Sequence, residues 1–251
     1  MRLDVYMTEN GLAPSRAKAQ QMIQSGAVCV DGQTVKKPSF DVTDACEVTV
    51  ESNPLQRYVG RGGLKLECAL ENFQLSPLGQ IAIDIGASSG GFTDCLLQHG
   101  AACVYAVDSG TGQLHPTLLD DSRVISMEGV NARFLTASDF PKTPTFAVMD
   151  VSFISQTIIL PAVADILAGG GTLVTLIKPQ FELERALLGK NGIVKDARLH
   201  KRAVERVCAC AQALGFRLVG CIESAWRGGD GNLEFLAYFT LQASDKEAHS
   251  I

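Results

Sequence analysis

The sequence predicts an α/β protein in which a mostly parallel, seven-stranded sheet follows a small α+β domain. Three observations indicate this fold. From about residue 64, short apolar segments alternate with helical patterns, which is typical of a parallel sheet covered on both faces. The last two apolar segments follow one another directly, which indicates an antiparallel hairpin at the C-terminal edge of the sheet. Residues 1–51 contain shorter elements and are set apart by a glycine-rich stretch.

The composition is that of a globular protein: 251 residues, 46% of them hydrophobic and 20% charged. A formal net charge of -5 argues against a wholly basic nucleic-acid-wrapping protein, so any RNA contact must come from a local patch. No apolar run reaches about 18 residues, and the N-terminus MRLDVYMTENGL lacks a secretory pattern. We therefore expect a cytoplasmic protein without stable membrane association.

The cysteines favour reduced core thiols rather than a metal site. They form no CxxC pair, and no histidine stands at zinc-ligand spacing. Most lie inside apolar runs, where free cysteine packs as a small hydrophobe. The eight residues are Cys29, Cys46, Cys68, Cys95, Cys103, Cys208, Cys210 and Cys221.

The N-terminal domain begins with an apolar segment at Leu3, Val5 and Met7. A helix is predicted over 15–26, where it ends at a glycine, and short strands are predicted over 27–32 and 46–51. The segment 52-SNPLQRYVGRGG-63 contains a proline and three glycines, which indicates a linker. We expect a small domain with the start of the linker at 1–57, a linker at 58–63, a second domain at 64–243 and a tail at 244–251.

The second domain is predicted to contain three helices and seven strands. The helices are expected over 64–73, 91–100 and 199–215, and the strands over 81–86, 102–108, 123–127, 146–150, 172–178, 216–223 and 233–241.

A glycine turn, 84-DIGASSGGFTD-94, connects the first of these strands to a helix. Glycines let the main chain approach a ligand closely, and the helix N-terminus favours an anionic group such as a carboxylate. Asp108 ends the next strand, where it can bind a ribose diol, although a helix cap is the simpler interpretation. The predicted cofactor-binding residues are Asp84, Gly86, Ala87, Ser88, Ser89, Gly90, Gly91, Phe92, Thr93, Asp108, Asn131 and Asp150. The GxxxG spacing resembles the turn of S-adenosylmethionine (SAM)-dependent methyltransferases more than that of dehydrogenases.

Four charged residues are candidates for catalysis: Lys65, Asp150, Lys178 and Glu234. Asp150 and Lys178 end consecutive strands, at the sheet edge where open α/β proteins bind ligands. A lysine at the end of a buried strand is costly unless it is paired or chemically useful, although it can also extend to solvent past Pro179. Lys65 and Glu234, taken singly, are more typical of surface residues.

Residues 1–51 resemble the small RNA-binding domain of the ribosomal-protein-S-four type. The resemblance rests on Arg2-Leu3-Asp4, Gly11-Leu12, Ser15-Arg16, Ala19, Ile23, Gly26, Val28, Val30-Asp31-Gly32 and Lys37-Pro38-Ser39. It implies RNA binding, for which the candidates are Arg2, Arg16, Lys18, Lys36, Lys37, Arg57 and Arg61. Acidic residues offset these charges, so only a one-sided arrangement would bind phosphates, and an ordinary solvated helix face is the alternative.

The four charged residues resemble the catalytic tetrad of FtsJ-type RNA ribose 2'-O-methyltransferases. The whole chain resembles the TlyA family, also called hemolysin A, through YVGRGGLKL, DIGASSGGFTD, VDSGTGQL, MDVSF and IKPQFE. The resemblance implies a Rossmann-like fold and SAM-dependent methylation of cytidine ribose in 16S or 23S rRNA, or both, with ribosomal RNA or ribosomal subunits as partners. We expect Lys178 to face the 2'-hydroxyl, with Asp150 and Glu234 orienting the two lysines.

Aromatic residues near the tetrad are few. Phe153, Phe181 and Trp226 are candidate surfaces for stacking against an RNA base, although core packing is the simpler interpretation of each.

Three other functions remain open at this stage. A non-catalytic RNA-binding factor for ribosome assembly is disfavoured by the complete tetrad, and a membrane-lytic protein is disfavoured by the missing apolar segment. A small-molecule methyltransferase is disfavoured by the N-terminal domain.

Overall fold

The computed structural model describes residues 1–24, 26–43, 45–50 and 57–243, which belong to two compact units, Met1–Arg57 and Tyr58–Ile251. The predicted tail at 244–251 and linker residues 52–56 lie outside the described residues. Residues 58–63, expected as a linker, are grouped with the second unit, and helix α3 already begins at Gly62. Tyr58 is buried there, and its side chain packs so closely on Gly63 that a Cβ on that glycine would lie 2.3 Å away.

The first unit contains two helices and a three-stranded antiparallel sheet in the order β2-β1-β3. Its elements are α1 (Leu3–Glu9), α2 (Arg16–Gln24), β1 (Val28–Val30), β2 (Gln33–Thr34) and β3 (Val48–Val50). The core gathers Leu3, Met7 and Ile23 against Val28 and Val30. This arrangement of two helices and a small sheet is the predicted α+β domain.

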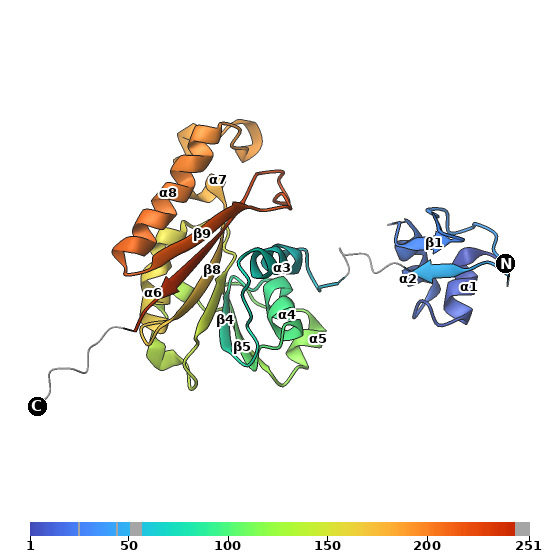
Figure 1. The fold of residues 1–251 in the computed structure, drawn as a ribbon, viewed down its shortest axis with the longest axis horizontal. Coiled ribbons are helices and arrows are strands. Elements are labelled where there is room, and N and C mark those ends of the chain that lie inside the picture. Colours follow the sequence, from blue (N-terminus) through green and yellow to red (C-terminus); the bar gives the residue numbers. More distant parts are fainter. Residues whose placement is uncertain (25, 44, 51–56, 244–251) are drawn as a thin grey trace, which may run out of the picture. The chain divides into compact units, whose positions relative to one another are not determined.

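The second unit is built on a seven-stranded sheet in the order β6-β5-β4-β7-β8-β10-β9 (Figure 1). Its strands are β4 (Ile81–Ile85), β5 (Cys103–Asp108), β6 (Val124–Glu128), β7 (Phe146–Met149), β8 (Gly171–Ile177), β9 (Arg217–Glu223) and β10 (Phe235–Leu241). The first five run parallel, whereas β10 lies antiparallel between β8 and β9. The predicted parallel sheet with an antiparallel edge hairpin is confirmed.

The strand order reverses beside β4, because the chain adds β5 and β6 on one side of it and β7 and β8 on the other. In open α/β sheets such a reversal opens a crevice at the carboxyl ends of the strands. The ends of β4, β5, β7 and β8 therefore define where a ligand can bind.

Helices cover both faces of this sheet. They are α3 (Gly62–Asn72), α4 (Gly91–Gln98), α5 (Pro116–Leu119), α6 (Leu160–Ile166), α7 (Pro179–Glu182) and α8 (Ala197–Ala213), and single 3-10 turns lie at Ala132–Phe134, Ala137–Asp139, Gln156–Ile158, Arg185–Leu187 and Lys190–Gly192. Residues of α3 and α4 form one core with Ala82 and Val104. Residues of α6 and α8 form the other with Ile83 and Ile85. Alternate residues of β4 therefore serve opposite faces, as a strand buried on both sides requires.

All eight cysteines are free thiols. Cys29, Cys95, Cys103 and Cys208 are buried, as expected, whereas Cys221 is exposed on the edge strand β9, where no further strand covers it. Across the described residues, we find no helix that is both long enough and apolar enough to cross a membrane.

Candidate active site

The glycine turn connects β4 to α4 and approaches the end of β7. Gly86 has a φ of +87°, and a Cβ at this position would lie 2.4 Å from the carbonyl oxygen of Asp150. Gly90 has a φ of +93°, and its Cβ would lie 2.2 Å from Leu118. At Gly86 a side chain is excluded by conformation and by space, because the contact is with backbone. At Gly90 the positive φ disfavours a side chain, and the Leu118 side chain would have to move to admit one.

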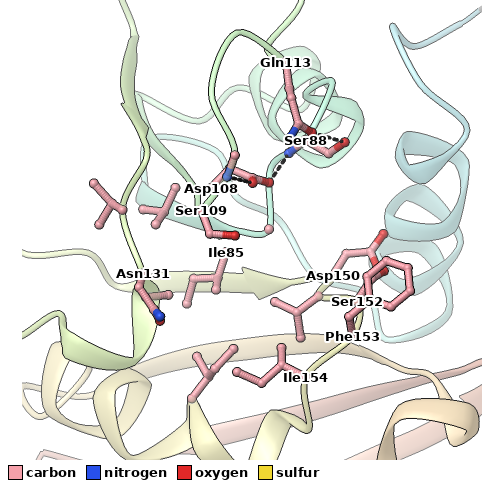
Figure 2. Close-up of a pocket in the computed structure, with 17 residues that line it drawn as sticks. Ile85, Ser88, Asp108, Ser109, Gln113, Asn131, Asp150, Ser152, Phe153 and Ile154 are labelled. Carbon is pink, nitrogen blue, oxygen red and sulfur yellow. Dashed lines mark hydrogen bonds between the residues drawn. The ribbon is translucent and has the colours of Figure 1, made fainter.

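Two clefts meet at this turn. The larger, of about 640 Å³, lies over the ends of β4, β5 and β7, and its lining residues are drawn in Figure 2. The smaller, of about 230 Å³, lies between the turn and the start of α3. Of the predicted cofactor-binding residues, Gly86, Ser88, Asp108, Asn131 and Asp150 line the larger cleft. Ala87, Ser89, Gly91 and Phe92 line the smaller one, together with Gly86, Ser88 and Asp150 again.

Asp108 holds the two loops that border the larger cleft. Its carboxylate accepts hydrogen bonds from the main-chain N–H of Ser88 at 2.8 Å and of Gly110 at 2.7 Å. It therefore caps no helix, and it joins the glycine turn to the loop that follows β5. Each carboxylate oxygen can still accept a further hydrogen bond from a ligand.

Asp84 lies beneath the turn rather than on the cleft wall. It is fully buried, and its Oδ2 accepts a hydrogen bond from Thr93 Oγ1 at 2.7 Å. Burial raises the pKa of Asp84 to about 7, against the hydrogen bond from Thr93 and with a further contribution from the charge of Asp150. Asp84, Gly90 and Thr93 line neither cleft, so they are placed to support the turn and not to contact a ligand directly.

Lys178 and Asp150 form an ion pair where the two clefts meet. Lys178 follows β8 and Asp150 follows β7, and Lys178 Nζ lies 2.7 Å from Asp150 Oδ1. The ammonium donates its well-aligned hydrogen bond to Ser152 Oγ, at 2.8 Å. Asp150 and Ser152 line both clefts, whereas Lys178 lines only the smaller one. The lysine is thus paired, and it does not simply extend to solvent.

Lys65 and Glu234 form the second pair. Lys65 lies in the second turn of α3, Glu234 directly precedes β10, and Nζ donates to Glu234 Oε2 at 2.5 Å. Both side chains are buried. Burial raises the pKa of Glu234, and the hydrogen bond from Lys65 opposes that shift.

The charges of the other pair also act on Glu234. Lys178 lowers its pKa and Asp150 raises it, so the two pairs form one electrostatic cluster of zero formal charge. The four candidates for catalysis are therefore brought together in the fold.

A buried polar network that the sequence did not reveal supports the Lys178–Asp150 pair. Glu182, at the end of α7, accepts hydrogen bonds from Ser155 Oγ at 2.6 Å and from the N–H of Gln156 at 2.8 Å. The Gln156 side chain then donates to the carbonyl of Leu176 and accepts from Thr175 Oγ1. The network fixes the strand end that precedes Lys178 to the loop that follows Asp150. Its only sequence signal was Glu182 in IKPQFE, where a surface residue was equally plausible.

Phe153 is an exposed aromatic residue on the wall of the larger cleft. It has a φ of +64°, its side chain is 91% exposed, and its ring lies 5.1 Å from that of Phe181. Core packing is therefore wrong for Phe153, because its ring is exposed to solvent. A non-glycine residue in this conformation is strained by about 1–3 kcal/mol, and such residues gather at functional sites. Trp226 is partly exposed, at 37%.

The RNA-binding candidates of the first unit include an organised arginine pair. Asp4 is fully buried, and it accepts hydrogen bonds from Arg2, Arg16 and Gln20 at 2.7–3.0 Å. The hydrogen bond from Arg2 is the main reason that the pKa of Asp4 lies well below its usual range. Both arginine side chains remain about half exposed.

The other candidates are dispersed. Lys18 donates to Gln21, whereas Lys36, Lys37 and Arg57 are exposed. Arg61 belongs to the second unit, where it lines the smaller cleft.

Comparison with known proteins follows the same division. Residues 58–241 match the FtsJ-like methyltransferase model and residues 1–47 match the S4 domain model. The chain is 45% identical over its whole length to the candidate rRNA methyltransferase YqxC of Bacillus subtilis, covering 89% of that protein. It is 39% identical to the 16S/23S rRNA (cytidine-2'-O)-methyltransferase TlyA of Mycobacterium tuberculosis, over 96% of this chain and 90% of that protein. A solved structure of a candidate hemolysin from Streptococcus thermophilus has a TM-score of 0.74 and 46% identity, covering 97% of this chain and 89% of that one.

Proposed function

Because the chain belongs to the FtsJ-like methyltransferase family and carries an S4 domain, we propose that it transfers a methyl group from SAM to a ribose 2'-hydroxyl of ribosomal RNA. Cytidine is the expected nucleoside, since it is named for the relative TlyA. The observation that carries the proposal is the position of the Lys178–Asp150 pair, at the junction of the two clefts.

The residues of the larger cleft fit SAM. The glycine turn places main chain on the wall of the cleft, at a position where a Cβ on Gly86 would collide with the carbonyl of Asp150. The Asp108 carboxylate can accept further hydrogen bonds, as a ribose diol requires. Gly86, Ser88, Asp108 and Asn131 would hold the cofactor, which supplies a methyl group already activated for transfer. The enzyme then needs chiefly to align the attacking hydroxyl, and such alignment can supply roughly 7–11 kcal/mol.

Lys178 would contact the 2'-hydroxyl from the smaller cleft. Its ammonium would stabilise the oxygen as it becomes negative, or, after losing one proton to solvent, its neutral amine would accept the proton of the hydroxyl. Asp150 and Ser152 hold the lysine in place, and the buried Lys65–Glu234 pair keeps the cluster neutral. The exposed ring of Phe153 supports RNA as the substrate, because a base that leaves its helix can stack on an aromatic side chain.

The test is transfer of labelled methyl from SAM to purified small subunits, large subunits and naked ribosomal RNA. Lys178→Ala should lower the rate by about 10²–10⁴-fold, since it removes the group that handles the proton. SAM affinity should change little, because Lys178 does not line the larger cleft. Lys201→Ala, which removes an exposed lysine of α8, is the matched control.

Two outcomes would contradict the proposal. Near-normal transfer by Lys178→Ala would exclude the role of this lysine. No label in any RNA from wild-type protein that binds SAM would favour a non-catalytic role in ribosome assembly.

A further inference from the structure

The loop at 109–114, between β5 and α5, forms one wall of the larger cleft through Ser109, Gly110 and Gln113. The loop belongs to no helix or strand, so its shape depends on hydrogen bonds from outside it. None of the residues predicted for the cofactor site lies in it.

Gly110 is held by Asp108 and by the main-chain N–H of Gly129, whereas residues 112–114 are held by one carboxylate at the end of β6. Glu128 Oε2 accepts from the N–H of Gly112 at 2.9 Å, and Oε1 accepts from those of Gln113 at 2.8 Å and Leu114 at 3.1 Å. These bonds, led by that of Gln113, lower the pKa of Glu128. Three consecutive main-chain donors on one anion fix the loop conformation without a helix or strand.

The anchored loop presents the side chain of Gln113 to the glycine turn. Ser88 Oγ donates to Gln113 Oε1 at 3.2 Å, and a Cβ on Gly110 would lie 1.9 Å from Gln113 Nε2. The amide therefore lies over the main chain of Gly110, beside the Asp108 carboxylate, as Figure 2 shows. Among the described residues, Gln113 Nε2 has no acceptor, although it lines the cleft.

We propose that Gln113 is a cofactor-binding residue and that Glu128 is its positioning residue. This inference rests on the proposed function, because it takes SAM as the ligand of the larger cleft. Gln113 Nε2 donates a hydrogen bond to the cofactor ribose while Asp108 accepts one from it, so the two side chains complement a diol, whose hydroxyls both donate and accept. Glu128 acts only through the loop that it holds.

Binding of S-adenosylhomocysteine to the full chain, measured by isothermal titration calorimetry, tests the proposal. Gln113→Ala and Glu128→Ala should each raise the dissociation constant about tenfold, the loss expected for one hydrogen bond in a well-ordered site. The double variant should bind no more weakly than the weaker single variant, because both changes remove the same contact. Glu128→Gln should fall between Glu128→Ala and wild type, because one amide oxygen can keep the bonds to Gln113 and Leu114.

A second measurement separates positioning from general damage. Hydrogen exchange of the Gly112, Gln113 and Leu114 amides in the cofactor-free protein should speed up in Glu128→Ala and stay unchanged in Gln113→Ala. Glu71→Gln, an exposed glutamate of α3, controls for the change in charge.

If Gln113→Ala bound S-adenosylhomocysteine with wild-type affinity, the proposed hydrogen bond from Gln113 to the cofactor would be wrong. A double variant about a hundredfold weaker, the product of the single effects, would overturn the role of Glu128 as a positioning residue. Wild-type protein that binds no S-adenosylhomocysteine would instead refute the proposed function itself, and the inference with it.

Discussion

The two halves of the site are built in different ways. The half proposed to bind the cofactor, here called the cofactor half, comprises residues 84–91, Asp108 and the loop at 109–114. It uses main-chain donors, glycines and single carboxylates from neighbouring strands. The tetrad half, Lys65, Asp150, Lys178 and Glu234, uses paired charges, and its members Lys65 and Glu234 are 169 residues apart. The cofactor half therefore depends on local backbone geometry, whereas the tetrad half depends on the completed fold.

Breaking the buried Lys65–Glu234 pair should have the largest effect on stability and activity. Lys65→Met leaves Glu234 buried without its partner, which should lower the free energy of unfolding by about 3–5 kcal/mol. Methyl transfer should be lost as well, while the folded fraction should still bind S-adenosylhomocysteine. Urea denaturation, the labelled-methyl assay and calorimetry measure these three outcomes in turn.

Lys201→Met serves as the control, because it breaks an exposed pair with Glu205 whose contribution is about 0.3–0.5 kcal/mol. If both variants lost the same stability, the buried pair would have no special structural importance.

Gly86→Ala should disrupt the cofactor half of the site. Its Cβ would collide with the carbonyl of Asp150, and the positive φ alone costs an alanine about 1–2 kcal/mol. Cofactor binding should be lost because the turn must move, whereas the Lys65–Glu234 pair should survive.

The matched control is Gly79→Ala. Gly79 also has a positive φ, of +70°, but a Cβ there would meet no neighbouring atom within 4 Å. It should lose stability but bind S-adenosylhomocysteine like wild type. Normal binding by Gly86→Ala would show that the close approach to β7 is not needed.

Asp84 should make the stability of the protein depend on pH. Its pKa of about 7 in the folded protein exceeds its ordinary value of 3.8, so the folded state binds the proton more tightly. This contribution to stability is present below the ordinary value and is lost as the pH rises through about 7. Asp84→Asn should therefore flatten the decline in unfolding free energy across this range, measured by urea titrations at several pH values.

Asp120→Asn, on an exposed surface near α5, should leave the pH dependence unchanged. Equal slopes for wild type and Asp84→Asn would contradict the raised pKa.

The sequence predicted most of the larger unit, because the period of its apolar residues reports burial directly. It missed α1, where Leu3, Val5 and Met7 alternate as in a strand, since the polar Asp4 between them is itself buried by its arginine partners. It also missed α6, whose sequence LPAVADI has too few polar residues to show helical periodicity.

The sequence predicted the site residues that lie in one continuous motif, but not those whose partners are distant along the chain. Residues of the glycine turn could be named because the motif is contiguous, whereas Glu128 and Glu182 are single acids whose partners come from other segments. Phe153 combines an exposed ring with a positive φ, and neither is reported by the pattern of apolar residues in the sequence.

The position of β10 near the end of the sequence determines when the buried ion pair can form during synthesis. Residues 81–150 contain every strand end that borders the larger cleft, so all of these strand ends are synthesised well before the last strand. Glu234 and β10 are translated much later, and only then does Lys65 gain its partner. The nascent chain thus carries all the strand ends of the larger cleft before it carries Glu234, and the buried ion pair with Lys65 can form only when β10, the last strand to be synthesised, joins the sheet.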